Sequence, residues 1–520
     1  MDNTSMKCSA LVALLGADKV LLPGSSGYNT SLSSYFSPQA AAVKPTCFVT
    51  PQTVEDVSNI VKSLTSPENG GPCDFAVRGG GHTWFANANS APEGITIDLR
   101  GLNRVSLNGD GTILSVGAGA TWDAVYGKLD PLGLSVAGGR VAGVGVGGLT
   151  LGGGISYFGP REGLTCNQVI SFQVVLADGS VVEAERGYNE DLWWGLRGGS
   201  NNFGIVTSIE FATFEQGLLW SALTLNPLTE VDNQAKIYAE LMAAENYDEN
   251  ASFLTGWAFA SKQGLSVTLN QLVYTRPVEN ETPAFYKPIL DLPAISNASA
   301  TTVVANMSTI AQNSVALQKP QAARYVQPKI HPVSPFPLSL FPSQSNYAKG
   351  SLLPLISYMT ATTTFVPTEA MIRAAYDAFN ASLSLLQDVT GIMWAVNLEP
   401  LPPHIYTRGG ADTNALGLTG RKGSLVVCLV SPSWSDAAHD EQVYSAARSL
   451  MADIEDRAKK LGVYDPYIYL DYAAPWQDVI KGYGEESVKK LQELRKKVDP
   501  NLVFTRNVKG GFKIPEEEGI

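Results

Sequence analysis

The chain is poor in the residues from which metal sites and reactive nucleophiles are built. It has only five cysteines and four histidines in 520 residues. No CxxC pair, HExxH motif or other metal-ligand spacing occurs, so we predict no metal site and no thioredoxin-like pair. GxSxG and GxxxxGK[ST] are missing too, which leaves serine hydrolases and P-loop NTPases without local support. We interpret the cysteines as buried or occasionally paired thiols: Cys8, Cys47, Cys73, Cys166 and Cys428.

Long apolar runs and clustered positive charge are also lacking. No apolar run approaches the roughly 20 residues that span a bilayer. The net charge is -12 without a long basic segment, so we expect neither nucleic acid nor a membrane as partner. The short apolar run Ser9–Leu15 follows Asp2, and we interpret it as the first helix, not a signal peptide.

Seven N-x-S/T sequons bear on location: Asn3, Asn29, Asn250, Asn280, Asn297, Asn306 and Asn380. Sequons arise often by chance, so they favour a secretory or extracellular location only slightly. With no leader in view, a cytoplasmic location stays open.

What is present is globular and mixed in structure. Hydrophobic residues make up 44% and charged residues 17%, and 520 residues exceed one ordinary core, so two domains are expected. A helix is predicted from Thr50-Pro51 through Leu64, and Thr121 is predicted to cap a helix that ends at Leu129. Phe75–Arg78 is predicted as a buried strand. The fold class is therefore α+β.

Two Asp-Gly pairs predict hairpins. Asp110-Gly111 lies between the apolar runs Ile95–Leu99 and Ile113–Val116, and Asp178-Gly179 lies between Val174–Ala177 and Ser180–Val182. Later segments are richer in proline, at His331–Pro337 and Glu399–Pro403. A final helix is predicted around Val488, Leu491, Leu494 and Val498, with a Glu486/Lys490 pair and Pro500 after it.

Two glycine clusters dominate the first 213 residues. One is Arg78-Gly-Gly-Gly-His82, and the other runs from Gly143 to Gly154. Consecutive glycines let the backbone approach a pyrophosphate, whose charge peptide N–H groups can meet. A formal GxGxxG begins at Gly143, but no clear strand precedes it, no helix follows immediately and no acidic residue has the expected spacing, so we reject a Rossmann interpretation.

A third cluster runs from Asp191 to Thr207 and predicts a buried helix, a glycine turn and a strand. Its Trp193 and Trp194 are interpreted as core residues. Together with Cys47–Pro51, Tyr469–Tyr472 and Asp499–Phe504, these clusters resemble the berberine bridge enzyme-like family. These are FAD-linked oxidoreductases of the PCMH-type (vanillyl-alcohol oxidase-like) fold, and Gly510–Lys513 resembles their fungal branch.

The resemblance implies a two-part FAD-binding domain and a substrate domain with an antiparallel sheet covered by helices. We expect the FAD-binding domain at 1–214 (core about 44–214) and the substrate domain at 215–440. We expect 441–520 to return to the FAD domain. The cofactor-binding residues implied by the resemblance are Arg78, Gly79, Gly80, Gly81, His82, Thr83, Gly143, Gly145, Gly147, Gly148, Gly152, Gly153 and Ile205.

The resemblance further implies that His82 carries a covalent bond to FAD. Family members with two links use a cysteine shortly before the second glycine run, where this chain has Val141. We therefore predict a single link, which disfavours an open-groove carbohydrate oxidase.

Three residues are candidates for catalysis: Tyr469, Asp471 and Glu399. Alternation would place Tyr469 and Asp471 on one strand face. Relatives usually have Asn where Asp471 stands, so Asp471 is either a base with a raised pKa or a hydrogen-bond acceptor for the cofactor. Tyr469 either handles a hydroxyl proton or packs on the flavin ring. Glu399 is a further base candidate, although we interpret it as a solvated loop carboxylate, with His404 in the same class.

The resemblance implies oxidation of a small organic, secondary-metabolite substrate by hydride transfer to flavin N5 and reoxidation by O2. The rivals are an FAD-scaffolded cyclase without net redox (Diels-Alder-type), a carbohydrate oxidase and a non-catalytic flavin-binding protein. The expected partners are the substrate and O2, and the expected state is a monomer or weak dimer.

Overall fold

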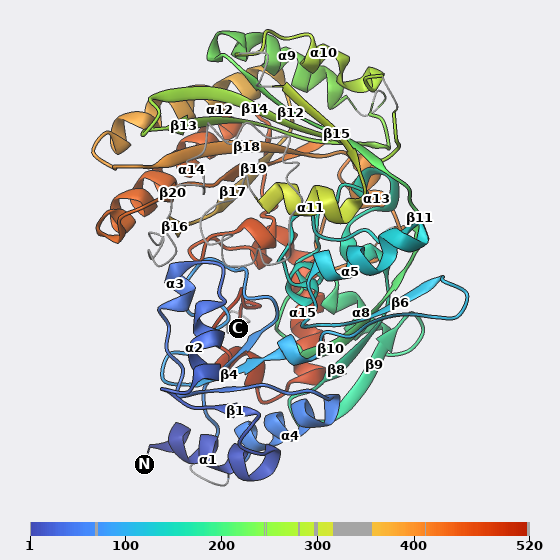
Figure 1. Cartoon of the computed structure of the whole chain (residues 1–520), viewed down its shortest axis with the longest axis vertical. Coiled ribbons are helices and arrows are strands. Elements are labelled where there is room, and N and C mark those ends of the chain that lie inside the picture. The colour runs from blue at the N-terminus through green and yellow to red at the C-terminus, as the bar shows by residue number, and fades with distance from the viewer. Residues whose placement is uncertain are drawn as a thin grey trace.

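The structure, a computed structural model, describes residues 2–67, 71–243, 245, 247–278, 281–295, 300–315, 356–410 and 412–516. The predicted Pro-rich segment His331–Pro337 and the sequons at Asn280 and Asn297 lie outside these residues. Figure 1 shows a lower half that holds both ends of the chain and an upper half built on one large sheet.

The first sheet of the lower half has the order β1-β2-β4-β3. Strands β2 (Cys47–Val49), β4 (Ile95–Asp98) and β3 (Phe75–Arg78) are parallel, and β1 (Val20–Leu21) pairs antiparallel with β2. Helix α1 (Asn3–Leu15) packs on α4 (Val54–Thr65). The strand β3 leads directly into the first glycine cluster, as its apolar residues predicted.

Helix α4 begins later than predicted. The Thr53 side chain accepts the N–H of Asp56, and the Asp56 carboxylate accepts the N–H of Thr53. This capping box starts the helix at Val54. Pro51 therefore precedes the helix, and the prediction that it occupies the first turn is wrong.

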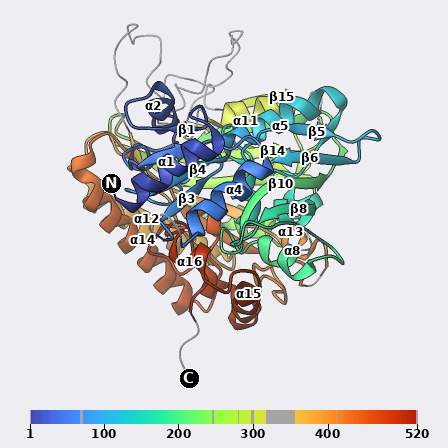
Figure 2. The same ribbon diagram turned by 90° about the horizontal axis from the view of Figure 1, so that it is seen from below.

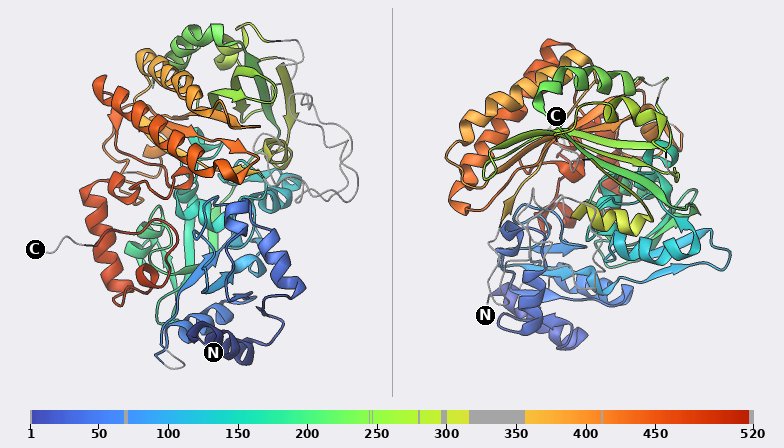
Figure 3. Two further views of the ribbon diagram at one scale, coloured as in Figure 1. Left: turned by 90° about the vertical axis from the view of Figure 1, so that its left-hand side faces the viewer. Right: turned by 45° about the horizontal axis from the view of Figure 1, so that its top comes forward.

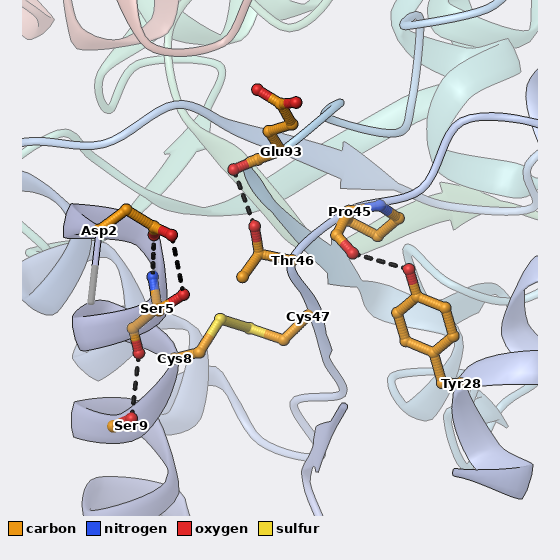
Figure 4. The surroundings of a disulfide bond; sticks show 9 residues. All are labelled: Asp2, Ser5, Cys8, Ser9, Tyr28, Pro45, Thr46, Cys47 and Glu93. Atoms are coloured by element: carbon orange, nitrogen blue, oxygen red, sulfur yellow. Dashed lines mark hydrogen bonds between the residues drawn. A yellow bond between two sulfur atoms is a disulfide. The ribbon is translucent and has the colours of Figure 1, made fainter. Parts of the chain in front are cut away.

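A disulfide joins Cys8 of α1 to Cys47 of β2 across 39 residues of sequence. Figure 4 shows the bond crossing from the helix to the strand, with Thr46 hydrogen-bonded to the carbonyl oxygen of Glu93 beside it. The cysteines Cys73, Cys166 and Cys428 are buried and free. The interpretation of buried or occasionally paired thiols is confirmed.

The second sheet is antiparallel in the order β5-β6-β10-β8-β9. Its strands are β5 (Val105–Leu107), β6 (Ile113–Gly117), β10 (Ile205–Ala212), β8 (Val169–Val175) and β9 (Val181–Glu185). Both Asp-Gly hairpins form, but the first joins β5 to β6. The segment Ile95–Leu99 belongs to the other sheet, because β4 pairs with two parallel neighbours there.

Short helices connect these strands: α5 (Trp122–Leu129), α6 (Val146–Leu151), α7 (Gly159–Glu162) and α8 (Glu190–Leu196). Thr121 is the N-cap residue of α5, although its side chain makes no capping hydrogen bond. Helix α6 begins inside the second glycine cluster, with Gly145 as its N-cap. The expectation that no helix follows this motif is therefore wrong. The strand that precedes the motif, β7 (Leu134–Ser135), has two residues.

The upper half is built on a sheet of order β15-β12-β14-β13-β18-β19-β17-β21 whose neighbouring strands are antiparallel. The strands are β15 (Ala300–Ala305), β12 (Leu219–Asn226), β14 (Leu265–Tyr274), β13 (Ala251–Ala260), β18 (Met393–Leu401), β19 (Leu425–Val430), β17 (Ala361–Phe365) and β21 (Tyr464–Asp465). Helices α9 (Val231–Leu241), α12 (Glu369–Ser382) and α14 (Asp440–Lys460) cover its outer face (Figures 1 and 3).

Alternation along β18 separates two environments. Trp394, Val396 and Leu398 pack in the core beneath the covering helices. Leu401 packs in the core of the lower half instead. Residues in phase with Leu401, among them Glu399, therefore lie on the inner face of the sheet, toward the lower half.

The chain returns to the lower half at its end. Helix α15 (Glu485–Val498) lies beside α8, and α16 (Val503–Arg506) lies near the first sheet (Figure 2). The Glu486–Lys490 ion pair predicted for α15 forms at 3.2 Å. No described helix combines the length and apolar character needed to cross a bilayer.

The remaining elements are α2 (Ser26–Ser33), α3 (Pro38–Ala41), β11 (Phe214–Glu215), α10 (Lys287–Leu290), α11 (Met307–Val315), β16 (Ser357–Tyr358), α13 (Pro403–Thr407) and β20 (Ser433–Trp434).

Candidate functional site

A cavity of about 300 Å³ lies where the glycine clusters meet the inner face of the large sheet and the C-terminal segment. Most of the residues proposed for the site line it: Gly79, Gly80, Gly81, His82, Thr83, Gly145, Gly147, Gly148, Ile205, Tyr469 and Asp471. Five do not line it: Arg78, Gly143, Gly152, Gly153 and Glu399. The cavity therefore joins segments that lie far apart in the sequence.

The two glycine clusters touch backbone to backbone. A Cβ atom on Gly80 would lie 2.6 Å from the backbone nitrogen of Gly145, and a Cβ on Gly145 would lie 2.5 Å from the backbone nitrogen of Gly80. No real side chain tolerates such approaches to backbone atoms. Glycine is needed at both positions for the two loops to form one wall.

Arg78 lies away from the cavity. Its fully buried guanidinium donates hydrogen bonds to Ser31 and Ser34 and lies 3.7 Å from the carboxylate of Asp98. Burial alone would raise the pKa of Asp98. The hydrogen bond that Asp98 accepts from Arg100 and the positive charge of Arg78 act against burial, and the pKa of Asp98 is lowered overall. Arg78 thus holds α2 to the first sheet beneath the glycine turn.

Three other glycines shape the surroundings of the cavity. A Cβ on Gly152 would lie 2.2 Å from Oδ1 of Asp471, so Gly152 makes room for that carboxyl group. Gly153 and Gly143 have φ angles of 110° and 85°, a region that side chains strain. Gly143, Gly152 and Gly153 therefore shape the cavity wall without lining the cavity.

His82 projects its ring toward the cavity and stacks on Phe36, with ring centroids 4.0 Å apart. Burial among protein atoms lowers the pKa of His82 to about 4, because burial disfavours the charged imidazolium. The ring is therefore neutral at ordinary pH and keeps a nitrogen lone pair available for bonding.

Tyr469 and Asp471 come together, but not on a strand. Leu470–Tyr472 is a turn of 3-10 helix with Tyr469 as its N-cap, so the predicted strand alternation is wrong. The Tyr469 hydroxyl donates to Oδ2 of Asp471 at 2.8 Å and accepts the N–H of Ile155 at 2.9 Å. Burial raises the pKa of Asp471 to about 7, and it raises the pKa of Tyr469 well above 10.

Glu399 is buried on the inner face of β18, with 1% of its surface exposed. The interpretation as a solvated loop carboxylate is wrong, because the carboxylate forms a two-point ion pair with Arg140 at 2.5 and 2.9 Å. Tyr472 donates to Oε2 of Glu399 at 2.8 Å and accepts from Arg140 at 2.5 Å. Burial by itself lowers the pKa of Arg140, but the charge of Glu399, the neighbouring Tyr472 and Tyr157 and the hydrogen bond to Glu399 together outweigh burial and raise it.

Sequence reasoning missed Arg140 and Tyr472, both of which line the cavity. In the sequence, Arg140 is a lone charged residue just before the second glycine cluster, and this could have indicated a role. Tyr472 belongs to the Tyr469–Tyr472 motif, but it was assigned no role from the sequence. His404, on α13, lies outside the cavity lining. Trp193 is buried as predicted, while Trp194 is partly buried at the margin of the same core.

The described residues fit a flavin dinucleotide. Two loops of glycine residues line the cavity, and the lack of side chains there lets a pyrophosphate approach the backbone. Apolar rings and alkyl groups line the rest, including Phe36, Trp84, Phe504 and Phe512. Val141 also lines the cavity. Among the residues that the structure places, no group of three or more His, Cys, Asp or Glu side chains is arranged to hold a metal ion.

Comparisons with known proteins agree with a cavity that fits FAD. A family model described as FAD binding domain matches residues 45–185. The chain is 32% identical to FAD-dependent monooxygenase CTB5 of Cercospora beticola, over 98% of this chain and 92% of that protein. It is 39% identical to Oligopeptidase PhomG' of Diaporthe leptostromiformis, over 97% of this chain but only 37% of that longer protein.

Solved structures share the fold. BBE-like 1 of Physcomitrella patens superimposes with a TM-score of 0.73 and 20% identity, over 98% of this chain and 99% of that chain. Glucooligosaccharide oxidase of Acremonium strictum superimposes with a TM-score of 0.68 and 19% identity, over 97% and 98%. The description of the latter names a 6-S-cysteinyl, 8α-N1-histidyl FAD.

Proposed function

Because this chain belongs to the fungal branch of the berberine bridge enzyme-like FAD-linked oxidoreductases, we propose that it is an oxidase of a small organic, secondary-metabolite substrate. The observation that carries the proposal is the gathering of two tyrosine–carboxylate pairs, Tyr469–Asp471 and Tyr472–Glu399, beside the glycine-walled cavity. FAD, when bound, supplies a two-electron acceptor that takes a hydride from substrate carbon at N5 and is reoxidised by O2.

The glycine loops would hold the cofactor. Gly79–Thr83, Gly145, Gly147 and Gly148 line the cavity, where their small residues would let the cofactor approach the backbone, and Ile205 would offer an apolar contact. Arg78, Gly143, Gly152 and Gly153 would act behind this wall, since their atoms shape it without lining it.

A single covalent bond to FAD through His82 is the second part of the proposal. The neutral ring of His82 lines the cavity, and a neutral nitrogen can bond to carbon. Val141 lines the cavity, and the family resemblance implies that doubly linked members have a cysteine at its position, which supports a single link. A tethered cofactor would survive denaturation of the protein.

The proton of a substrate hydroxyl would leave through Tyr472. As Tyr472 takes that proton on its oxygen, its own proton moves to Oε2 of Glu399, 2.8 Å away. Arg140 holds the carboxylate in place through its two-point ion pair, and general-base catalysis requires such positioning. Burial raises the pKa of Tyr472, so a direct tyrosinate base is disfavoured and transfer to Glu399 is the easier route.

Several curated relatives are called FAD-dependent monooxygenases, which favours oxygen insertion as a second candidate function. The two functions differ in their products. An oxidase returns one H2O2 for each O2 consumed, whereas a monooxygenase places one oxygen atom in the product. Oxygen uptake with a panel of phenols and alcohols, with and without catalase, separates them.

His82→Ala tests the cofactor assignment. Acid precipitation of the wild-type protein should leave yellow colour in the pellet, and the variant should release all of it, because the attachment atom is gone. His439→Ala is the matched control, since His439 lies outside the cavity at the N-cap of α14. Colour that leaves the wild-type pellet, or stays with the variant, would refute the covalent bond. A folded protein that takes up no flavin would refute the function.

A further inference from the structure

Two tyrosine–carboxylate pairs lie at one cavity. Tyr469, Asp471 and Tyr472 come from a single short segment and line the cavity, and Glu399 of β18 lies behind Tyr472. Tyr469 is hydrogen-bonded to Asp471, and Tyr472 to Glu399, both at 2.8 Å. The rings of Tyr469 and Tyr472 meet edge to face with centroids 4.9 Å apart. A substrate in the cavity would therefore meet two proton-handling groups at once.

The pairs differ in the charge beside them. Arg140 contacts both oxygens of Glu399 and also donates to Tyr472. Within the described residues, no cation pairs with Asp471. A guanidinium stabilises an ionised carboxylate, whereas a buried carboxyl without a cation holds its proton more strongly.

The other titratable groups around each carboxyl are uncharged when protonated and do not alter this contrast. Those that act on Asp471 are Tyr467, Tyr469, Tyr483 and Cys166. Those that act on Glu399, besides Arg140, are Tyr157, Tyr238, Tyr247, Tyr469 and Tyr472. Burial raises the pKa of Asp471 to about 7.

The fold makes specific room for Asp471. The backbone of Gly152 lies so close that any side chain there would collide with the carboxyl oxygen. Members of the family that this chain resembles usually have Asn at this position, and an amide has no acidic proton to donate. This chain therefore has a carboxyl group where such relatives have an amide, and the backbone at Gly152 leaves space for it.

We propose that Asp471 and Tyr469 form the proton-donating pair of the site, opposite the proton-accepting pair Glu399 and Tyr472, with Arg140 as the positioning residue that keeps the two roles apart. Carboxyl groups in contrasting environments are how active sites divide acid from base. The inference rests on the proposed function and narrows its substrate class. The substrate carries a hydroxyl group that loses a proton and a second oxygen, such as a carbonyl oxygen, that accepts a proton during the reaction and returns it as the product leaves.

The substrate loses a hydride to the cofactor and one proton, so any proton that it gains on its second oxygen has to be returned. The substrate hydroxyl proton passes to Tyr472 as the Tyr472 proton passes to Glu399. The Tyr469 proton passes to the second substrate oxygen as the carboxylic proton of Asp471 passes to Tyr469, and both transfers reverse as the neutral product leaves. Glu399 ends protonated and Asp471 ends as it began, and the proton on Glu399 balances the one that formation of H2O2 from the reduced cofactor and O2 consumes.

Infrared difference spectra of the flavin-loaded full-length protein between pH 5 and pH 9 test this division, because a protonated carboxyl has its own C=O band. We expect a buried carboxylic band that disappears as pH rises through about 7, where Asp471 titrates. Asp471→Asn should lack the band and Glu399→Gln should keep it. Arg140→Gln should add a second band, since Glu399 loses its cation.

Each other outcome overturns the proposal. A band that survives in Asp471→Asn and disappears in Glu399→Gln reverses the roles, and a wild-type protein with no titrating carboxyl above pH 5 leaves Asp471 without a proton to donate. If Asp471→Asn does not fold, Tyr469→Phe replaces it. That variant removes a hydrogen bond that lowers the pKa of Asp471, so the midpoint should rise, and an unchanged midpoint contradicts the pair. Flavin absorbance of the same samples tests the proposed function separately.

Discussion

At the scale of single residues, Arg140 and Glu399 depend on each other. Both are mostly buried, with side-chain exposures of 13% and 2%. Removing one partner of a buried ion pair leaves an uncompensated charge and costs about 3–5 kcal/mol. We expect Arg140→Met to lower the thermal unfolding midpoint strongly, and Glu399→Gln added to it to restore most of the loss.

The control for this pair is Arg373→Met. Arg373 forms an ion pair with Asp232 at the surface, where both side chains are well exposed. Such pairs contribute about 0–1 kcal/mol, so its midpoint should barely move. Equal effects of Arg140→Met and Arg373→Met, or a double variant no better than Arg140→Met alone, would show that the buried pair is not coupled as described.

The residues of this pair also mark the limit of sequence reasoning. Arg140 and Glu399 are 259 positions apart, and no local pattern relates them. Glu399 was read as a loop carboxylate because three prolines follow it closely, but β18 continues through Pro400 to Leu401. Asp471 was easier to identify, because it replaces an expected Asn in a recognisable motif.

At the scale of elements, the contact between the two glycine loops is the feature that shapes the cavity. We expect Gly80→Ala and Gly145→Ala each to abolish flavin binding, because a Cβ at either position collides with the backbone of the other loop. Flavin content after refolding with excess FAD is the measurement.

Gly127→Ala is the matched control for the glycine variants. Gly127 lies in α5, and a Cβ there meets nothing within 4 Å. Alanine in a helix interior should stabilise by up to about 1 kcal/mol, with full flavin content. Normal flavin content in Gly80→Ala would contradict the close approach.

The sequence predicted these elements unevenly. The two hairpins, α4 and β3 could be predicted because their sequence signals are local. Asp-Gly turns predicted the hairpins, helical spacing predicted α4, and the apolar run before Gly79 predicted β3. The partner of β6 was misassigned, since Val105–Leu107 is a short strand of partly buried residues with little apolar signal. The strand expected at Tyr469 fails because alternation over three residues does not distinguish a strand from a 3-10 turn.

At the scale of the whole molecule, the site needs three distant parts of the chain. Arg140 belongs to the glycine-rich half, Glu399 to the large sheet and Tyr472 to the returning segment. Recognition of the family motifs predicted a two-part FAD-binding half, a helix-covered antiparallel sheet in the other half, and most of the residues that line the cavity. The packing that joins these parts is tertiary, so motifs could not supply it, and the boundaries at 214 and 440 stay predictions.

The C-terminal segment closes one end of the cavity, with Gly511 and Phe512 in its lining. Asn201 donates to the carbonyl oxygen of Gly510 and Asn202 to that of Phe512, at 3.1 and 2.9 Å. Arg495 donates to the carbonyl oxygen of Ile514 at 2.6 Å. Truncation after Val508 should therefore open the cavity and weaken flavin binding.

The truncation is best measured in the His82→Ala background, where flavin binding is reversible. We expect the dissociation constant to rise at least about tenfold, equivalent to losing one or two net hydrogen bonds and an apolar contact. Lys509→Ala is the control, because the ion pair of Lys509 with Asp74, at 3.8 Å, is exposed, and its loss should leave affinity unchanged. A truncated protein that binds flavin as tightly as its parent would mean that the tail covers the cavity without contributing to cofactor binding.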